Sequence, residues 1–274
     1  MTEKLHKVLA DLGVGSRREM ERWISANRVK VNGVIATLGD RVGEHETIVV
    51  DGHNVRDSQT KKKRPRIIIY HKPEGEITSR KDPEGRKSVF DSLPSLNKER
   101  WVSVGRLDFN TAGLMIFTTD GELANELMHP RNQIEREYVC RVMATEVDEA
   151  MLKRLVEGVE LEDGPANFTR LAAMRGESVN RWFSVSLTEG KNREVRRLWE
   201  SQGVMVNRLK RVAYGSVVLP SFLGQGRWLE LTPKEMKGVY RMANLKPKAD
   251  LSWLPSEVER YERQVARLRR GGNK

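Results

Sequence analysis

The chain has 274 residues, of which 32% are charged and 38% are hydrophobic, and its formal net charge at pH 7 is +11. This length is sufficient for two domains, one of them with a sizeable core. No apolar run approaches the roughly 20 residues that cross a bilayer, and residues 1–13 lack the apolar segment of a signal peptide. The single cysteine, Cys140, excludes an internal disulfide. These features predict a cytoplasmic protein that is not bound to a membrane.

The basic excess is concentrated near the two ends of the sequence. Residues 1–66 hold 14 Lys and Arg against 9 Asp and Glu, and residues 246–274 hold 8 against 4. Residues 67–245 hold 27 against 25 and are therefore nearly neutral. Basic flanks attract polyanions irrespective of base sequence, although such charges are often merely solvated. The distribution favours a nucleic acid as the partner.

Two short helices and a hairpin are predicted at the start of the chain. Apolar residues repeat at i, i+3, i+4 and i+7 within residues 5–12. The tetrapeptide Ser16-Arg-Arg-Glu19 is a capping box that opens a second helix. Residues 29–31 and 34–35 flank Asn32-Gly33, a pair that favours the type I′ turn of a hairpin.

The string SRREMERWISANRVKVNG, residues 16–33, resembles the alpha-L RNA-binding domain of a small-subunit ribosomal protein. The resemblance implies that residues 1–56 form an RNA-binding domain. A generic helix–hairpin fold with solvated charges is the alternative. The RNA contacts that the resemblance implies are Arg17, Arg18, Arg22 and Lys30.

Composition changes mark two further boundaries. Residues 57–66, DSQTKKKRPR, are polar and charged and include a proline, so they are predicted to link two domains. The second domain is predicted over residues 67–245. The basic tail, residues 246–274, has a capping signal at Ser256 and is predicted to be partly helical. This tail could contact RNA or simply keep the protein in solution.

Strands and helices alternate irregularly in the second domain. Strands are predicted at 67–70, 101–105, 114–118, 136–139 and 181–187, and helices at 122–128, 147–155 and within 188–199. Because no regular βαβ repeat is present, the pattern predicts an α+β fold with a mostly antiparallel mixed sheet, flanked by helices and loops.

The stretch from residue 101 to 130 carries the strongest indication of chemistry. Its two predicted strands enclose a short loop bracketed by Gly105 and Gly113, and this loop carries Asp108. Loops held by a rigid scaffold are where catalytic residues concentrate. Spacing alone favours a simpler interpretation, because an Asp in such a loop is more often a turn former that bonds its own backbone.

The full string GRLDFNTAGLMIFTTDG, residues 105–121, resembles the signature GRLD-x-x-T-x-G-L-L-x-x-T-x-D-G of pseudouridine synthases of the RsuA/RluB family. KPEG at 72–75 and KNREVRR at 191–197 resemble two further motifs of this family, in its order. The sequence departs from the pattern at Ala112, Met115 and Thr119, none of which is implied to touch the reacting groups. DPEGR and LTEGKNREVRRLWE favour the branch that acts on large-subunit ribosomal RNA.

The resemblance implies a role for several side chains. Asp108 is the implied catalytic carboxylate, and Arg196 is the cation that keeps it ionised. Tyr138 is implied to stack on the uracil, and Arg106 to fill the gap that a flipped base leaves in the RNA. The remaining residues that we predict to bind RNA are Lys72, Lys191, Arg193 and Arg197.

The implied reaction converts a uridine of 23S ribosomal RNA, free or in a large-subunit assembly intermediate, to pseudouridine. The sequence contains no phosphate-binding, zinc or acyl-transfer motif, and we expect no cofactor and no metal. We expect a monomer. The alternatives are a non-catalytic RNA-binding protein of ribosome assembly, and a synthase that acts on small-subunit ribosomal RNA or transfer RNA.

Overall fold

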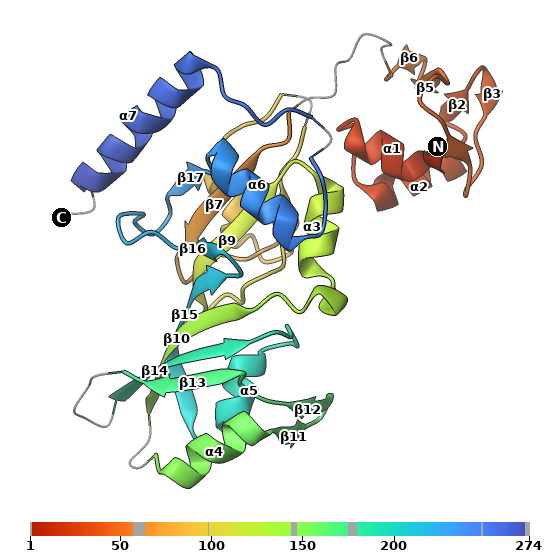
Figure 1. The fold of residues 1–274 in the computed structure, drawn as a ribbon. Helices are drawn as coiled ribbons and strands as arrows, with labels where there is room; N and C mark the ends of the chain where they lie inside the picture. The colour runs from red at the N-terminus through yellow and green to blue at the C-terminus, as the bar shows by residue number, and fades with distance from the viewer. Residues whose placement is uncertain are drawn as a thin grey trace.

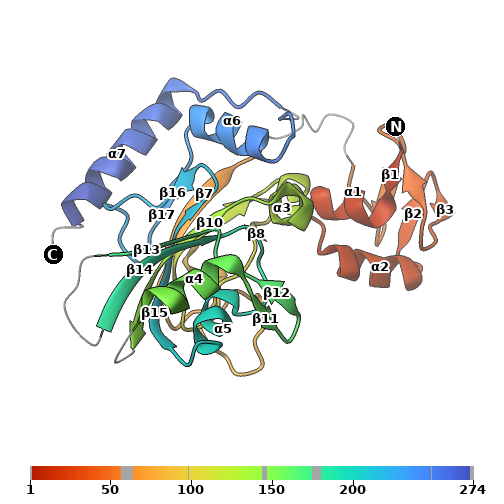
Figure 2. The same ribbon diagram turned by 60° about the horizontal axis from the view of Figure 1, so that its bottom comes forward.

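The computed structural model describes residues 2–56, 64–97, 99–143, 147–174, 180–247 and 249–271. Most of the predicted linker, residues 57–63, therefore lies outside the described residues. A small N-terminal domain lies at one end of the molecule, and helix α7 (Pro255–Gly271) lies on the far side of the larger domain (Figures 1 and 2).

The N-terminal domain contains the two predicted helices and the predicted hairpin. Helix α1 (Leu5–Asp11) precedes helix α2 (Arg17–Ser25), and the capping box of Ser16 and Glu19 is present. The strands are β1 Glu3–Lys4, β2 Val29–Val31, β3 Val34–Ile35, β4 Arg41–Val42, β5 Ile48–Val50 and β6 His53–Asn54. Strands β3-β2-β5-β6 form one sheet, and β1 pairs with β4. The turn residue Asn32 has a φ of +49°, as a type I′ turn requires.

The larger domain is built on one mixed sheet, which has nine strands in the described part of the chain. They are β7 Ile67–Lys72, β8 Val102–Val104, β9 Ala112–Thr118, β10 Arg136–Met143, β13 Arg170–Ala173, β14 Asn180–Leu187, β15 Met205–Tyr214, β16 Val217–Val218 and β17 Trp228–Glu230. Their order is β13-β14-β10-β15-β9-β7-β17, with β8 added to β9 and β16 to β15. Only β9 and β15 pair in parallel among these strands. The prediction of an α+β fold with a mostly antiparallel sheet is confirmed.

Two groups of helices pack on the two halves of this sheet. Helices α3 (Gly121–Met128), α6 (Pro233–Met242) and α7 accompany the half that contains β7, β9 and β17 (Figure 1). Helices α4 (Glu149–Glu157) and α5 (Glu194–Glu200), with the hairpin of β11 (Val159–Leu161) and β12 (Gly164–Ala166), accompany the other half. Two short 3-10 helices are η1 Val89–Ser92 and η2 Pro130–Asn132.

The side chains of the larger domain form separate cores rather than one. The first joins β7 and β9 to α3 and α6, and the second joins β10, β14 and β15 to α5. A third lies on the opposite face of β7 and β9, where Val89 and Trp101 cover Tyr70 and Phe117. Cys140 is fully buried in the second core, where burial raises the pKa of its thiol to about 12. A buried thiol with a raised pKa is a poor nucleophile.

The predicted elements differ from the structure mainly at their ends. The helix predicted at 147–155 covers Glu149–Glu157, because Asp148 caps it by accepting from the Met151 amide. The helix predicted within 188–199 begins at Glu194. The tail forms a 17-residue helix that begins at Pro255, so it is more ordered than the sequence predicted.

Candidate active site

The loop that carries Asp108 runs from β8 to β9, and the sheet fixes both of its ends. Strands β8 and β9 are antiparallel, with Val104 opposite Ile116. Gly113 has a φ of +114°, and a Cβ placed on it would lie 2.2 Å from the Arg211 carbonyl oxygen. Only glycine permits this approach of β15 to β9. Gly113 therefore allows the end of the loop to pack directly against β15.

Lys72 holds the loop through hydrogen bonds to the backbone carbonyl groups of the loop. Its side chain is fully buried, and Nζ donates to the carbonyl oxygens of Pro73 (2.9 Å), Asp108 (3.1 Å), Phe109 (3.4 Å) and Thr111 (2.8 Å). Burial lowers the pKa of this amine to about 8, although nearby carboxylates, including that of Asp108, oppose the shift. The prediction that Lys72 contacts RNA is wrong, because its ammonium group faces the protein interior.

Other donors hold the rest of the same backbone. The Thr78 hydroxyl donates to Leu107 (2.9 Å), the Gly75 amide to Phe109 (2.9 Å), and the Arg196 guanidinium to Asn110 (2.8 Å). Each of the five consecutive carbonyl groups from residue 107 to 111 thus accepts a hydrogen bond from another part of the chain, from β7, the segment after it, or α5. Such a loop holds the Asp108 backbone in one conformation before any ligand arrives.

Arg196 reaches this loop from α5, but it does so through the backbone. The side chain is buried; Nη1 donates to the Val206 carbonyl (2.6 Å), and the buried Nε has no hydrogen-bond partner among the described residues. Burial is the largest influence on the pKa of Arg196 and lowers it, whereas the charge of Asp108 raises it. The two residues therefore interact electrostatically, but no salt bridge joins them in the described part of the chain.

Asp108 itself is at the surface of the domain. Its side chain is half-buried, and Arg106 and Phe109 of the same loop are exposed. The Arg106 side chain makes no hydrogen bond or salt bridge to any residue that the structure describes. A carboxylate and a free guanidinium are thus presented together from a rigid loop.

Tyr138 lies near this loop because of the strand register. It is opposite Arg211 of β15, and Arg211 is opposite Gly113 of β9. Adjacent strands lie about 4.8 Å apart, so about 10 Å separates the Tyr138 and Gly113 backbones. The Tyr138 ring is half-buried between the second and third cores. The structure therefore brings Asp108, Tyr138 and Arg196 to one region of the sheet.

The other predicted RNA contacts occupy three different environments. Arg17, Arg18, Arg22 and Lys30 are exposed on the N-terminal domain. Arg193 is exposed, whereas Lys191 donates to the Pro165 carbonyl (2.5 Å). Arg197 makes a bidentate pair with Asp163 (2.7 and 2.9 Å), which joins α5 to the β11–β12 hairpin. Lys191 and Arg197 thus already have protein partners.

Thr78 and the Gly75 amide were not identified from the sequence. Gly75 belongs to the KPEG motif, so its position was visible, but its amide contact with the loop was not.

Within the described residues, no group of three or more His, Cys, Asp or Glu side chains could hold a metal ion. None of the described helices is long and apolar enough to span a membrane.

Comparisons with known proteins place this geometry in a family. The family model described as RNA pseudouridylate synthase matches residues 66–201, and the S4 domain model matches residues 3–48. Ribosomal large subunit pseudouridine synthase B of Pseudomonas aeruginosa is 53% identical over 263 residues, which cover 96% of this chain and 68% of that protein. The chain belongs to the RNA pseudouridine synthase family.

Other members of the family extend the similarity. The protein of the same name from Salmonella typhimurium is 50% identical over 272 residues, which cover 98% of this chain and 93% of that protein. A solved structure, "Crystal structure of pseudouridylate synthase", is similar in fold, with a TM-score of 0.60 and 23% identity over 86% of this chain and 99% of that one. The resemblance to pseudouridine synthases of the RsuA/RluB family is confirmed, and the chain is an enzyme of this family with an N-terminal S4 domain.

Proposed function

We propose that this synthase converts a specific uridine of 23S ribosomal RNA to pseudouridine, with Asp108 as the catalytic carboxylate. The proposal rests on the hydrogen bonds that fix the loop backbone around Asp108. Five consecutive carbonyl groups are held from other segments, so the carboxylate is positioned before substrate binds. The relatives named for the large ribosomal subunit support the choice of RNA.

The reaction makes defined demands on the site. The target uridine leaves the stack, its glycosidic bond breaks, the uracil turns, and a carbon–carbon bond forms at carbon 5. Asp108 serves either as a nucleophile at the anomeric carbon or as a base toward the neighbouring ribose carbon. Since the product is an isomer of the substrate, the step needs no cofactor and no energy source. A monomer is sufficient, and the cytoplasm, where ribosomal RNA is found, is the proposed location.

Three side chains near Asp108 take supporting roles in this proposal. The Arg196 guanidinium favours the ionised carboxylate through its charge. The Tyr138 ring stacks on the extruded uracil. Arg106 is exposed and has no protein partner among the described residues, and its planar guanidinium occupies the gap that the base leaves. We further propose domain limits of 1–56 and 67–245, a linker at 57–66 and a tail at 246–274.

Replacing the carboxylate by an amide tests the proposal. Asp108→Asn is expected to form no detectable pseudouridine in unmodified 23S ribosomal RNA, while its affinity for that RNA changes by less than about threefold. Glu259→Gln, an exposed residue of α7, removes the same charge and should react like the unaltered enzyme. Pseudouridine is mapped in total RNA, so that a small-subunit or transfer RNA target is detected. Product from Asp108→Asn would disprove the catalytic assignment.

A further inference from the structure

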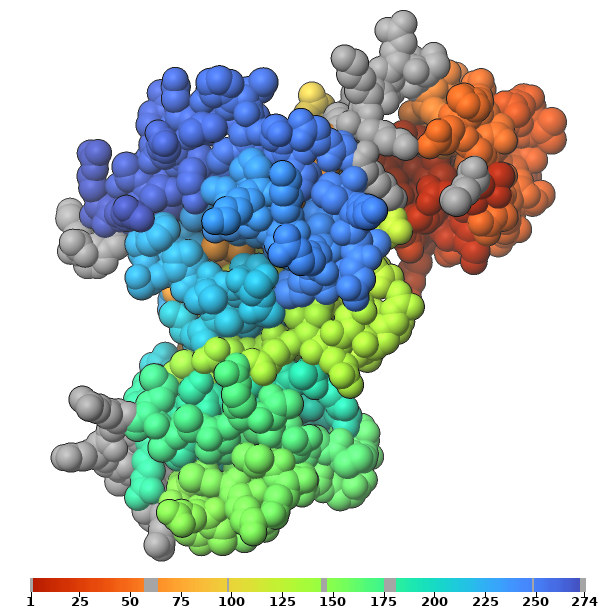
Figure 3. Space-filling model, in the orientation of Figure 1, coloured from red at the N-terminus to blue at the C-terminus, as the bar shows by residue number. Residues whose placement is uncertain are grey.

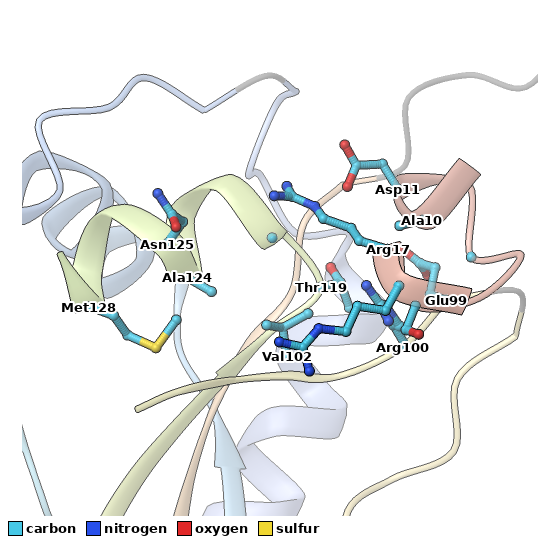
Figure 4. Close-up of a pocket in the computed structure, with 14 residues that line it drawn as sticks. Ala10, Asp11, Arg17, Glu99, Arg100, Val102, Thr119, Ala124, Asn125 and Met128 are labelled. Atoms are coloured by element: carbon cyan, nitrogen blue, oxygen red, sulfur yellow. The ribbon is translucent and has the colours of Figure 1, made fainter. Parts of the chain in front are cut away.

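A cavity lies between the S4 domain and the catalytic domain, and Asp108 is not part of its lining. Its volume is about 330 Å³. On one side it is lined by the end of α1 and the start of α2, and on the other by α3 and the segment before β8 (Figure 4). The space-filling view shows the S4 domain packed beside α3 at this place (Figure 3). The cavity therefore lies at the interface between the two domains.

Three arginines converge on this cavity from both domains. Arg17 and Arg18 belong to α2, and Arg100 precedes β8. Figure 4 shows the side chains of Arg17 and Arg100 extending in the same direction, toward α3. No hydrogen bond or salt bridge joins any of the three guanidinium groups to another residue in the described part of the chain. Arginines without protein partners beside a cavity are available to a ligand.

The charges in the cavity favour an anion that carries one negative charge. Burial lowers the pKa of Arg100, the charge of Asp11 opposes this shift, and the charge of Arg17 adds to it. The charges of Asp11 and Arg17 therefore both act on this guanidinium group. Asp11 and Glu99 also line the cavity. Among the charged residues that line the cavity, three are positive and two are negative, so the lining itself carries a net charge of +1. A phosphodiester balances this charge, whereas a di- or triphosphate exceeds it.

The α3 side of the cavity has a different chemistry. Met128, which is 37% exposed, provides apolar surface, and Asn125 provides an amide. A thioether packs well against a flat ring, and an Asn side chain can both donate to and accept from a base edge. The cavity volume is at the lower end of the range for small-molecule sites. It accommodates one nucleotide and is too small for a duplex.

We propose that this cavity binds one nucleotide of the RNA substrate at a position away from the reacting uridine. The phosphodiester lies between Arg17 and Arg100, with Arg18 at the rim, and the base lies against Met128 and Asn125 of α3. The site rests on the proposed function only in that the ligand is RNA. RNA bound there connects the S4 domain to the catalytic domain and thereby fixes the position of one domain relative to the other.

The test measures RNA binding in the Asp108→Asn background, where no product forms. Arg17→Gln, Arg100→Gln and the double variant are titrated with unmodified 23S ribosomal RNA at several KCl concentrations. Each single variant should weaken binding about tenfold. Because both side chains share one phosphate, the double variant should lose the salt dependence of about one contact, roughly 0.7 to 0.9 in the log–log slope, and not of two. Arg241→Gln, an exposed arginine of α6, is the matched control.

Two further variants separate a phosphate site from a structural joint. Arg100→Lys keeps the charge and should recover most of the affinity and the salt slope, and Met128→Ala should weaken binding without changing the slope. If Arg100→Gln binds like Arg241→Gln, the proposal is wrong. It is also wrong if Arg100→Lys and Arg100→Gln lose affinity equally and both lower the unfolding temperature. Enzyme with Asp108 intact is assayed for pseudouridine separately, so a failure of the proposed activity is distinguished from a failure of this site.

Discussion

Lys72 brings a positive charge into the protein interior, and its partners there are backbone carbonyl oxygens. No carboxylate forms a salt bridge with it in the described part of the chain, and three of the four carbonyls that accept from Nζ belong to residues 108–111. Arg196 uses its guanidinium in the same way on Asn110. Two buried cations thus position a loop whose only acid is Asp108, and both contribute positive charge near that acid.

This arrangement predicts an alkaline limit to activity. Burial lowers the pKa of Lys72 from 10.5 to about 8, so the amine loses its proton as the pH rises above 8 and the loop loses a donor. The rate of pseudouridine formation at saturating RNA should fall there with the slope of one proton. In Lys72→Met the rate should be about 10²-fold lower, because the loop is no longer held, and this alkaline limb should be absent.

The lowered pKa of Lys72 has the opposite effect on stability: activity is expected to fall as the pH rises, whereas stability is expected to increase. Between pH 8 and 10.5 the unfolded chain binds more protons at Lys72 than the folded one does, so the contribution of this residue to stability rises with pH. Denaturant titrations of the unaltered enzyme and of Lys72→Met at pH 7 and 9 measure this difference. An alkaline limb that persists in Lys72→Met would assign the titration to another group.

The two glycines that bracket the loop make a matched pair for mutation. Gly105 has a φ of +75° and open space where a Cβ would lie, whereas a Cβ on Gly113 would lie 2.2 Å from the Arg211 carbonyl oxygen. Gly105→Ala should cost about 1 kcal/mol of unfolding free energy, and Gly113→Ala more than about 2 kcal/mol. Urea denaturation compares the two. Equal losses would show that backbone conformation alone, rather than contact with β15, requires glycine at 113.

The identities of these residues were predictable from the sequence, and their partners were not. Asp108 and Arg196 lie in the GRLD and KNREVRR motifs, Tyr138 lies in the predicted strand at 136–139, and the structure brings the three to one region. The prediction failed for Lys72, because the sequence does not distinguish a lysine that donates to backbone carbonyl groups from one that binds phosphate. Backbone acceptors carry no sequence signal, so neither the five held carbonyls nor the Arg196 contact with Asn110 could be foreseen.

Helix α7 shows how an element of ambiguous sequence becomes ordered. Its Tyr261, Val265 and Leu268 are partly buried against the first core, and Gln264 donates to the Trp228 carbonyl (2.9 Å). Arg64 pairs with Glu257 near its start. The sequence predicted a basic helix here. It could not predict docking, because contacts such as that of Gln264 with the Trp228 carbonyl join residues far apart in the chain.

The pairing of Arg64 with Glu257 is expected to hold the start of this helix. The hydrogen bond from Arg64 lowers the pKa of Glu257 from 4.5 to about 2. Its contribution to stability is therefore present above pH 4.5 and is lost as the pH falls toward 2. Glu257→Gln should speed amide hydrogen exchange in α7 several-fold at pH 7, and Glu259→Gln should not. Equal exchange in the two variants would mean that apolar contacts alone hold the helix.

In the proposed function, the residues that bind RNA and the residue that performs the chemistry lie on different domains. Arg22 and Lys30 are exposed on the S4 domain, and the carboxylate that we propose as catalytic lies on the other domain. The sequence placed the basic excess at the two ends of the chain, which agrees with this division. The cavity between the domains was not predictable, because it is made by the docking of α2 beside α3.

Neutralising the S4 domain should therefore change affinity and not the chemical step. Arg22→Gln with Lys30→Gln should raise the KM for 23S ribosomal RNA and lower the salt slope by up to about two contacts, while kcat stays within about twofold. Lys234→Gln with Lys237→Gln on the exposed side of α6 is the charge-matched control. A fall in kcat at saturating RNA would mean that the S4 domain also shapes the active site.

The two halves of the central sheet meet where β9 and β15 run in parallel. Only two residue pairs match across this junction, Ala112 with Lys210 and Gly113 with Arg211. Separate cores lie on its two sides, so these two pairs join parts of the sheet that are otherwise packed separately. Gly113 belongs to one of these pairs and lies five residues from Asp108 in the chain. The position of the Asp108 loop therefore depends on how the two halves of the sheet are joined at this glycine.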